Sequence, residues 1–384
     1  MTETDFTTDT ISEADAFTSL RGEWDELVRA MPRPCPFFLH AWLSEWWNHY
    51  GQDRELAVHV ARRHGQLAAA LPLCSHRRFG IRVTEFVGGQ GTALADLLLA
   101  EGESRVVAAG VAERASAAGG HLTDLFGLPS PSVLVQALDG ANLHLLQRIE
   151  SPVLDLSAGW ESVYAAKTSS KKRNLHRRRQ RQLESLGRLE LNLARTPPEL
   201  EEAIEDAFRL HALRWAGRPD GSGFGTAVGM RFHRAALRAL GEADVARIMT
   251  LKLNGRAIAF HYYFALWGCM YVHRLAFDPA FSRYSPGLVA TLATLEAASA
   301  EGLTRVEFLG GAERYKAEIA DRNEPLYQAI GLAHGPVGHA LLNGRLAFIS
   351  TRRHMGRSRL RRFYYDGLAP VRRFMTRSAR TNRG

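Results

Sequence analysis

Cysteine is scarce in this 384-residue sequence, and its scarcity excludes two kinds of stabilised fold. Cys35, Cys74 and Cys269 are odd in number and lie far apart, so they supply neither a disulfide framework nor a paired-cysteine metal site. We expect three small, buried apolar side chains in a reducing compartment. The sequence therefore predicts a cytoplasmic protein that binds no metal.

Long apolar runs are also missing. No stretch approaches the roughly 20 apolar residues that a membrane-spanning helix needs. The first fifteen residues are acidic and polar, whereas a secretory signal starts with basic residues and an apolar run. Hydrophobic residues nevertheless make up 46% of the chain, which is ordinary for a folded core. At this length we expect two domains. Without a secretory signal we expect no export.

Several catalytic motifs are absent. Neither GxGxxG nor GxxxxGK[ST] occurs in the strand–loop–helix context that binds nucleotides, which disfavours a Rossmann dehydrogenase and a P-loop NTPase. No Ser-His-Asp or Cys-His constellation is recognisable. A mechanism that depends on a nucleophile from the protein is therefore not indicated.

The two halves of the chain repeat one order of predicted elements: two helices, a β-hairpin, a strand, a long helix and a returning strand. In the first half these are residues 14–30, 38–50, 56–73, 81–87, 104–118 and 121–126. In the second half they are residues 198–215, 228–240, 245–264, 270–277, 287–300 and 305–309. The hairpins turn at His64-Gly65 and Asn254-Gly255, and Asn-Gly favours a type I′ turn.

This repetition indicates duplication of one α/β unit, although common α/β parts also recur by chance. We interpret Pro152–Ser157 as the entry strand of the second copy. The predicted fold class is α/β with a mixed sheet in two tandem modules. The expected domains are residues 1–150, residues 151–335 and a basic amphipathic tail at residues 336–384.

A loop that suits an anion precedes the long helix of the second half. Helix N-termini carry unpaired N–H groups and partial positive charge, Gly287 permits close backbone approach, and Arg283 adds a cation. An ordinary capped turn has the same ingredients. The loop follows a series of strands rather than the first strand of a βαβ unit, which favours a phosphate site. The predicted donor-binding residues are Arg283, Tyr284, Ser285, Pro286, Gly287 and Leu288.

With this loop in place, the second half resembles a known family. The order of elements resembles the GNAT acyl-CoA-dependent acyltransferases, and more specifically those associated with cellulose and exopolysaccharide biosynthesis, distant relatives of the Fem-type aminoacyltransferases. The matching stretches are Ser170–Arg179, Leu210–Trp215, Ala276–Pro279, Tyr284–Leu288 and Glu307–Lys316. The sequence departs from the wider pattern at Ser285-Pro286, where small residues usually line the pyrophosphate loop, and at Val289.

The resemblance implies an acyl-CoA donor, such as acetyl-CoA, and gives weight to two residues after the last strand. Lys316 could stabilise charge on the attacked carbonyl, and Tyr315 could protonate the leaving group. Without the resemblance, both read as structural residues. His273 and His261 lie on predicted strands beside the site, where either a base or a hydrogen-bonded core histidine fits. Our predicted catalytic residues are Lys316, Tyr315 and His273.

Basic residues concentrate in two places. Residues 167–181 form a dense basic run that fits a solvated helix face or a platform for a phosphorylated ligand equally well. Our predicted substrate-binding residues are Arg173, Asn174, Arg214 and His261. Residues 341–384 hold twelve Arg and one acid, Asp366, which predicts attachment to an anionic membrane surface or another acidic partner.

The sequence thus predicts an acyltransferase that acts on an amine or hydroxyl acceptor, within exopolysaccharide or cell-envelope glycan biosynthesis. The first module would shape the acceptor cleft, because the acidic residues 100–104 at its own helix start would repel a pyrophosphate. One alternative is a Fem-like, aminoacyl-tRNA-dependent transferase, the one reading in which nucleic acid binds. Another is a non-catalytic scaffold. Acceptor, acyl length and oligomeric state are not indicated.

Overall fold

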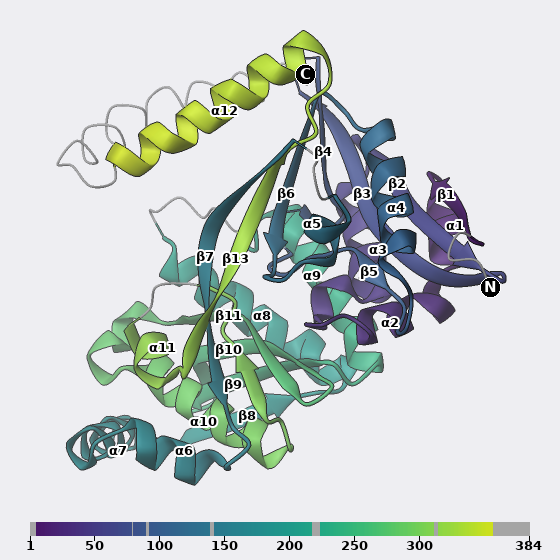
Figure 1. Ribbon diagram of the computed structural model, residues 1–384. Helices are drawn as coiled ribbons and strands as arrows, with labels where there is room; N and C mark the ends of the chain where they lie inside the picture. The colour runs from purple at the N-terminus through teal and green to yellow at the C-terminus, as the bar shows by residue number, and fades with distance from the viewer. Residues whose placement is uncertain are drawn as a thin grey trace, which may run out of the picture. The chain divides into compact units, whose positions relative to one another are not determined.

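The computed structural model describes residues 5–78, 80–89, 92–138, 142–216, 223–310 and 314–355 (Figure 1). The chain forms two compact units, Met1–Leu332 and Ala333–Gly384, and each is described by itself. In the first unit, one long mixed sheet runs through both halves of the sequence.

From either edge of this sheet inward, the strands follow the order in which they occur in the repeated unit. From one edge to the other it is β1 (Thr7–Ile11), β2 (Arg54–Arg63), β3 (Gln66–Arg78), β4 (Ile81–Phe86), β6 (Leu122–Leu128), β13 (Arg322–Gly331), β7 (Leu143–Asp155), β12 (Arg305–Glu307), β11 (Cys269–Phe277), β10 (Arg256–Leu266), β9 (Ala246–Leu253) and β8 (Leu189–Ala194), with the short β5 (Leu98–Leu99) paired to β3. The pairs β4–β6 and β11–β12 are parallel, and the other pairs are antiparallel.

The last strand of each module is exchanged with the other module. β7 follows the first module's elements but pairs with β12, and β13 follows the second module's elements but pairs with β6. β7 and β13 then pair with each other and join the halves, as the two long central strands of Figure 1 show. Pro152–Ser157 therefore overlaps the end of a longer exchanged strand rather than forming the entry strand of the second copy, which is β8. The expected boundary at residue 150 lies inside β7.

Both hairpins turn where the sequence predicts. His64 and Gly65 have φ of 52° and 81°, and Asn254 and Gly255 have φ of 50° and 77°. Two successive positive φ values are those of a type I′ turn, whose twist matches the paired strands. The repeated hairpins therefore come from local turn chemistry as well as from the apolar pattern.

Helices cover both faces of the sheet. The first module has α1 (Ala14–Thr18), α2 (Arg21–Arg29), the 3₁₀ turn η1 (Pro36–Phe38), α3 (His40–Tyr50), α4 (Arg105–Ala118) and α5 (Val133–Ala137). The second has α6 (Trp160–Lys167), α7 (Ser170–Glu184), α8 (Pro197–Arg214), α9 (Ala227–Glu242), the 3₁₀ turn η3 (Pro279–Tyr284), α10 (Pro286–Ala300) and α11 (Arg314–Ile319).

Alternating side chains of β10 separate the two faces. Phe260, Tyr262 and Phe264 join a core that includes residues of α3, α8 and α9, whereas Tyr263 joins a second core beneath α10. This alternation is the ordinary consequence of strand geometry. α8 starts with a capping box at Thr196, whose side chain and that of Glu199 satisfy each other's backbone N–H groups.

A buried ion-pair network also ties the halves together. The Glu307 carboxylate on β12 is fully buried and accepts hydrogen bonds from Arg33, before α3, and from Arg305. Arg33 and Arg305 also pair with Glu324 on β13 at 3.3 Å and 3.0 Å. Arginine forks suit such shared carboxylates. The network joins residues that lie far apart in the sequence.

The second unit contains α12 (Gly335–Met355), on which Val337 and Phe348 are exposed. The remainder of the predicted tail, residues 356–384, lies outside the described residues. Among the helices that are described, none combines the length and the apolar character required to cross a membrane.

Candidate active site

An opening lies in the second module where two neighbouring strands diverge. β11 and β12 pair in parallel from Cys269 to Tyr271, but β12 ends at Glu307 whereas β11 continues to Phe277. Past Tyr271, His273 and Arg274 are partly exposed although β11 is an inner strand of the sheet. We call this place the β11–β12 opening.

A β-bulge sits at the opening. Tyr262 on β10 pairs with Arg274, but the next residue, Tyr263, pairs with Val272, so His273 is the extra residue. Bulges redirect side chains, and His273 faces the α8–α9 side. Its ring centroid lies 4.9 Å from that of Tyr262, 5.4 Å from that of His233 and 5.5 Å from that of Trp42.

These four side chains share an unusual feature. Trp42 Nε1, His233 Nδ1, the Tyr262 hydroxyl and His273 Nε2 are buried and have no hydrogen-bond partner among the described residues. Buried polar atoms are normally paired, because an unmade bond costs about 1–3 kcal/mol. The four atoms come from α3, α9, β10 and β11. We call them the aromatic–histidine cluster, a place where ligand groups or water can complete the hydrogen bonding.

The electrostatics of the cluster keep its imidazoles neutral. Burial holds the pKa of His233 and of His273 well below the ordinary value, and the charge of Arg274 lowers both further. Burial also raises the pKa of the Tyr262 hydroxyl far above its ordinary value. A neutral imidazole keeps a lone pair that can accept a hydrogen bond or a proton, and the lowered pKa makes both rings weaker bases than a free histidine.

Two other predicted residues meet on the α10 side of the sheet. Lys316 is buried, and its Nζ donates to the carbonyl oxygens of Gly310 at 2.5 Å and Phe308 at 3.5 Å. His261 is 1% exposed, and neither of its ring nitrogens has a partner among the described residues. Burial, and then the Lys316 charge, lower the pKa of His261 to about 3. Lys316 thus holds the chain that follows β12, close enough to influence His261.

Tyr315 lies on α11, but its side chain is outside the described part of the structure. The predicted proton donor therefore stays a prediction.

The predicted donor loop forms η3 and the first turn of α10. Ser285 has φ of 56°, and its carbonyl accepts from the N–H groups of Leu288 at 3.0 Å and Val289 at 3.2 Å. Pro286 has no N–H. In this first turn the Gly287 N–H remains without an acceptor among the described residues. The helix start therefore offers fewer N–H donors than the sequence suggests.

Packing against β11 leaves no room for a side chain at Gly287. A Cβ at this position would lie 2.9 Å from Cδ1 of Phe277 on β11, closer than Cβ atoms are found. The close approach is therefore between α10 and β11. The Arg214 guanidinium lies 5.5 Å from the centroid of the same Phe277 ring, so Arg214 is placed beside the donor loop.

Cations gather at this loop. The Arg283 guanidinium stacks 4.5 Å from the Tyr284 ring centroid and donates to the Tyr284 hydroxyl. Arg179 of α7 donates to the Arg283 carbonyl oxygen. The sequence drew attention to the basic run but not to Arg179 individually, because only the packing of α7 against η3 brings it there.

Arg173 and Asn174 have local roles in the described contacts. Arg173 donates to the carbonyl oxygens of Ala165 and Thr168 at the end of α6, and Asn174 accepts from Arg177 at 2.9 Å. No described contact ties either residue to His261, His273 or Lys316.

Sequence reasoning missed Trp42, His233 and Tyr262. Trp42 comes from the first module, and no local pattern distinguishes it from a core residue. The one available signal was the polar His233 on the apolar face of a predicted helix. No group of three or more His, Cys, Asp or Glu side chains in the described residues is arranged to hold a metal ion.

Comparisons with known proteins concern the second half of the chain at the level of sequence and most of the chain at the level of fold. Residues 170–317 match the family profile described as "Acetyltransferase (GNAT) domain". No curated protein matches the chain. Among solved structures, the chain is similar to FemX, with a TM-score of 0.57, 9% identity, and coverage of 84% of this chain and 96% of that chain.

Two further structures are similar. One is the C-terminal domain (DUF2156) of a lysylphosphatidylglycerol synthetase from Agrobacterium fabrum, with a TM-score of 0.53, 13% identity, and coverage of 86% and 96%. The other is L-PGS from Bacillus licheniformis, with a TM-score of 0.50, 15% identity, and coverage of 79% and 91%. At these identities the likeness concerns the fold. The predicted fold class is confirmed: a mixed α/β sheet built of two GNAT-like modules, the second carrying the acetyltransferase-type segment.

Proposed function

We propose that the chain is an acyltransferase whose donor enters the β11–β12 opening and whose acceptor binds at the aromatic–histidine cluster. The observation that carries the proposal is the convergence of four unpartnered, buried polar atoms beside the bulged strand of the GNAT-type segment. A structural core would pair such atoms or replace them by apolar ones. A ligand with several hydrogen-bonding groups satisfies them.

The chemistry is direct attack. The acceptor amine or hydroxyl forms a bond to the donor's carbonyl carbon and gives up its proton to a neutral imidazole, His273 or His233. The bond from that carbon to the donor sulfur or oxygen breaks, and the leaving group takes up a proton. Beyond Tyr271, backbone N–H groups of β11 on the side facing the opening have no β12 partner and suit the carbonyl oxygen.

Acyl-CoA is the donor that the loop favours. The Gly287 N–H, the positive end of α10 and the guanidinium groups of Arg283 and Arg179 lie at one place. Together they suit the diphosphate of a CoA ester.

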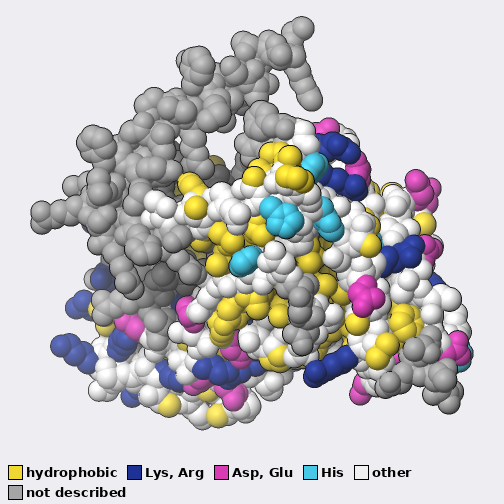
Figure 2. Space-filling view, turned by 45° about the horizontal axis from the view of Figure 1, so that its top comes forward, with side chains coloured by type: hydrophobic (Ala, Val, Ile, Leu, Met, Phe, Trp, Pro, Cys, Tyr) yellow, Lys and Arg dark blue, Asp and Glu magenta, His cyan; other side chains and the backbone are white. Residues whose placement is uncertain are grey.

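Aminoacyl-tRNA is a second candidate donor, for two reasons. The first turn of α10 offers a single described N–H, which is few for a diphosphate. In addition, α7 presents the exposed cations Lys171, Arg178 and Arg181, and basic side chains gather along the lower left edge of Figure 2, the side on which Figure 1 places α7. An exposed basic helix suits a nucleic-acid backbone.

A role in exopolysaccharide or envelope glycan biosynthesis rests on sequence resemblance, as does the alternative of a non-catalytic scaffold. A cytoplasmic location rests on the three scattered cysteines, and attachment to the inner membrane surface rests on the basic tail.

Calorimetric titration of the full chain with acetyl-CoA, and separately with charged tRNA, tests the donor. Arg283→Gln should weaken acetyl-CoA binding, whereas Arg188→Gln, an exposed arginine paired with Glu190, should not. Binding of charged tRNA alone would select the second donor, and binding of neither would favour the scaffold.

A screen of acceptors with labelled acetyl-CoA tests the chemistry. His273→Gln should lose turnover while it retains donor affinity. Full turnover in this variant and in His233→Gln would remove the histidines from the mechanism.

A further inference from the structure

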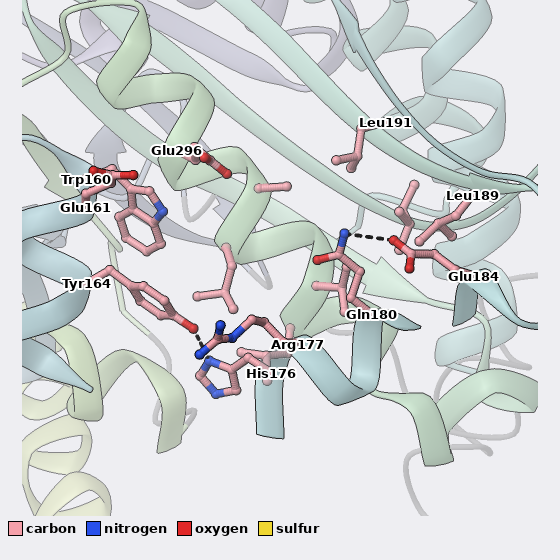
Figure 3. A pocket seen from close by; sticks show the side chains of 15 residues that line it. Trp160, Glu161, Tyr164, His176, Arg177, Gln180, Glu184, Leu189, Leu191 and Glu296 are labelled. Carbon is pink, nitrogen blue, oxygen red and sulfur yellow. Dashed lines mark hydrogen bonds between the residues drawn. The ribbon is translucent and has the colours of Figure 1, made fainter. Parts of the chain in front are cut away.

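A cavity of about 370 Å³ lies away from the proposed active site, between α6, α7, α10, the edge strand β8 and its neighbour β9 (Figure 3). This volume is in the range of sites for small organic ligands. None of His261, His273 and Lys316 lines it. Of the predicted donor-loop residues, Leu288 alone lies in its wall, at the start of α10.

The floor of the cavity is apolar. It is formed by apolar side chains of β8, β9 and α10. These are Leu189 and Leu191 of β8, Leu251 of β9, and Leu288, Val289, Leu292 and Ala293 of α10. Leu191 remains 47% exposed, although it lies on a strand of the main sheet. Covering such surface stabilises a complex by about 25 cal/mol per Å². The floor therefore suits a hydrocarbon chain.

Aromatic rings form one wall. Trp160 and Tyr164 stack with centroids 5.0 Å apart, and Tyr164 stacks on His176 at 5.9 Å. The Tyr164 hydroxyl and His176 Nδ1 are hydrogen-bonded at 2.8 Å, as Figure 3 shows. The backbone N–H of Trp160 donates to the Ser299 hydroxyl of α10 at 3.0 Å, which fixes the start of α6 against α10. The wall is thus held in place without a ligand.

Carboxylates outnumber cations in the lining. Glu161, Glu184 and Glu296 line the cavity, and Glu161 and Glu296 have no cationic partner among the described side chains. Figure 3 places both near Trp160, whereas Glu184 accepts a hydrogen bond from Gln180 at the other end. The one lining arginine, Arg177, already donates to Asn174 at 2.9 Å.

Histidine does not offset this negative charge. Burial, and then the charge of Lys172, lower the pKa of His176, so its ring is neutral at pH 7. None of the other cations of α7 lines the cavity; Lys172 pairs with Glu318 at 2.8 Å, and Arg179 donates to the Arg283 carbonyl. Exposed charges on the far side of the helix are largely screened at physiological salt.

We propose that this cavity binds an amphiphilic organic cation, with its ammonium group between Trp160, Glu161 and Glu296 and its hydrocarbon body on the leucine floor. Aromatic faces and carboxylates are the groups that recognise ammonium ions. The charge of the lining disfavours an anionic amphiphile of the same length. The site is separate from the acyl-transfer centre, so the inference goes beyond the proposed function and does not depend on it.

The test is calorimetric titration of the full chain with octyltrimethylammonium below its micellar concentration, and with octanoate and octanol for comparison. The cation should bind at least about tenfold more tightly than octanoate. Glu161→Gln combined with Glu296→Gln should weaken its binding by about tenfold. Both positions are exposed, so the double variant should fold, which circular dichroism checks. Glu113→Gln on α4, an exposed glutamate of the first module, is the matched control.

Three results would overturn the proposal: no binding of the cation, equal or tighter binding of octanoate, or unchanged affinity in the double variant. A second variant tests the floor. Leu191→Ser should weaken the binding of octyltrimethylammonium but leave the binding of the short tetramethylammonium ion unchanged. Unchanged binding of the octyl ligand to this variant would count against the proposed orientation. Titration of acetyl-CoA into the same samples reports separately on the acyl-transfer proposal.

Discussion

His261 should make the protein acid-sensitive, and the size of the effect follows from its burial. An unfolded chain protonates histidine with a pKa of about 6.5, whereas burial beside Lys316 lowers the pKa of His261 to about 3 in the folded state. Between these values the unfolded state binds more protons, so stability falls as the pH falls. From pH 7 to pH 5, His261 alone should cost about 2 kcal/mol of unfolding free energy.

The assay is urea denaturation at pH 7 and pH 5 for the natural chain and for His261→Gln. Glutamine does not titrate, so the variant should lose about 2 kcal/mol less over this interval, whatever its stability at pH 7. His144→Gln, an exposed histidine on β7, should behave as the natural chain. Equal losses in His261→Gln and the natural chain would mean that His261 is solvated or paired, and the described arrangement around Lys316 would be wrong.

Four further outcomes are expected. Lys316→Ala should lower acyl-transfer turnover by about 10²-fold with little change in acetyl-CoA affinity, because it releases the segment after β12 that Lys316 holds at Phe308 and Gly310; steady-state kinetics and calorimetry decide, and natural turnover would leave Lys316 without a role in positioning the site. Gly287→Ala should cost about 1–3 kcal/mol, because its Cβ would lie 2.9 Å from Phe277; denaturation measures this, and an unchanged midpoint would contradict the packing. Glu307→Gln should cost about 3 kcal/mol, because it removes the buried negative charge that Arg33 and Arg305 share and leaves them Glu324 alone; the same assay applies, and a loss below about 0.5 kcal/mol would mean that the network contributes little to stability. The full chain should sediment with anionic vesicles at low salt and not at high salt, whereas a chain truncated after Pro336 should not sediment; indifference of both to vesicles would exclude a membrane role for the tail.

Local signals were sufficient for most elements of the duplicated unit. The Asn254-Gly255 turn, the periodic apolar face of α9 and the glycine at the start of α10 each mark an element through nearby residues. β8 and β13 were not predicted. β8 lies at the edge of the sheet, and β13 begins with polar residues such as Arg322 and Glu324. In both strands the alternation of apolar and polar side chains that identifies a strand is therefore weak.

The donor side of the candidate site was more predictable than the acceptor side. Arg283 and Gly287 belong to one continuous loop, so sequence spacing places them together. The aromatic–histidine cluster instead joins Trp42, His233, Tyr262 and His273, which meet through tertiary packing alone. No periodicity connects a tryptophan of the first module to a bulge in the second.

The exchange of final strands and the packing of α3 on α9 explain why the proposed acceptor site draws on both modules. The GNAT-type segment ends at residue 317 and begins after β7, so it contains neither β7, which pairs with β12, nor β13. Without β7, the edge of β12 would expose unpaired backbone groups and part of the core beneath α10, since Leu154 and Leu156 belong to that core. In addition, α3 of the first module packs against α9 of the second, where Trp42 reaches His233. The exchanged strands and the α3–α9 packing therefore make the first module, which has an acidic segment where the second has its predicted donor loop, a structural part of the proposed acceptor site.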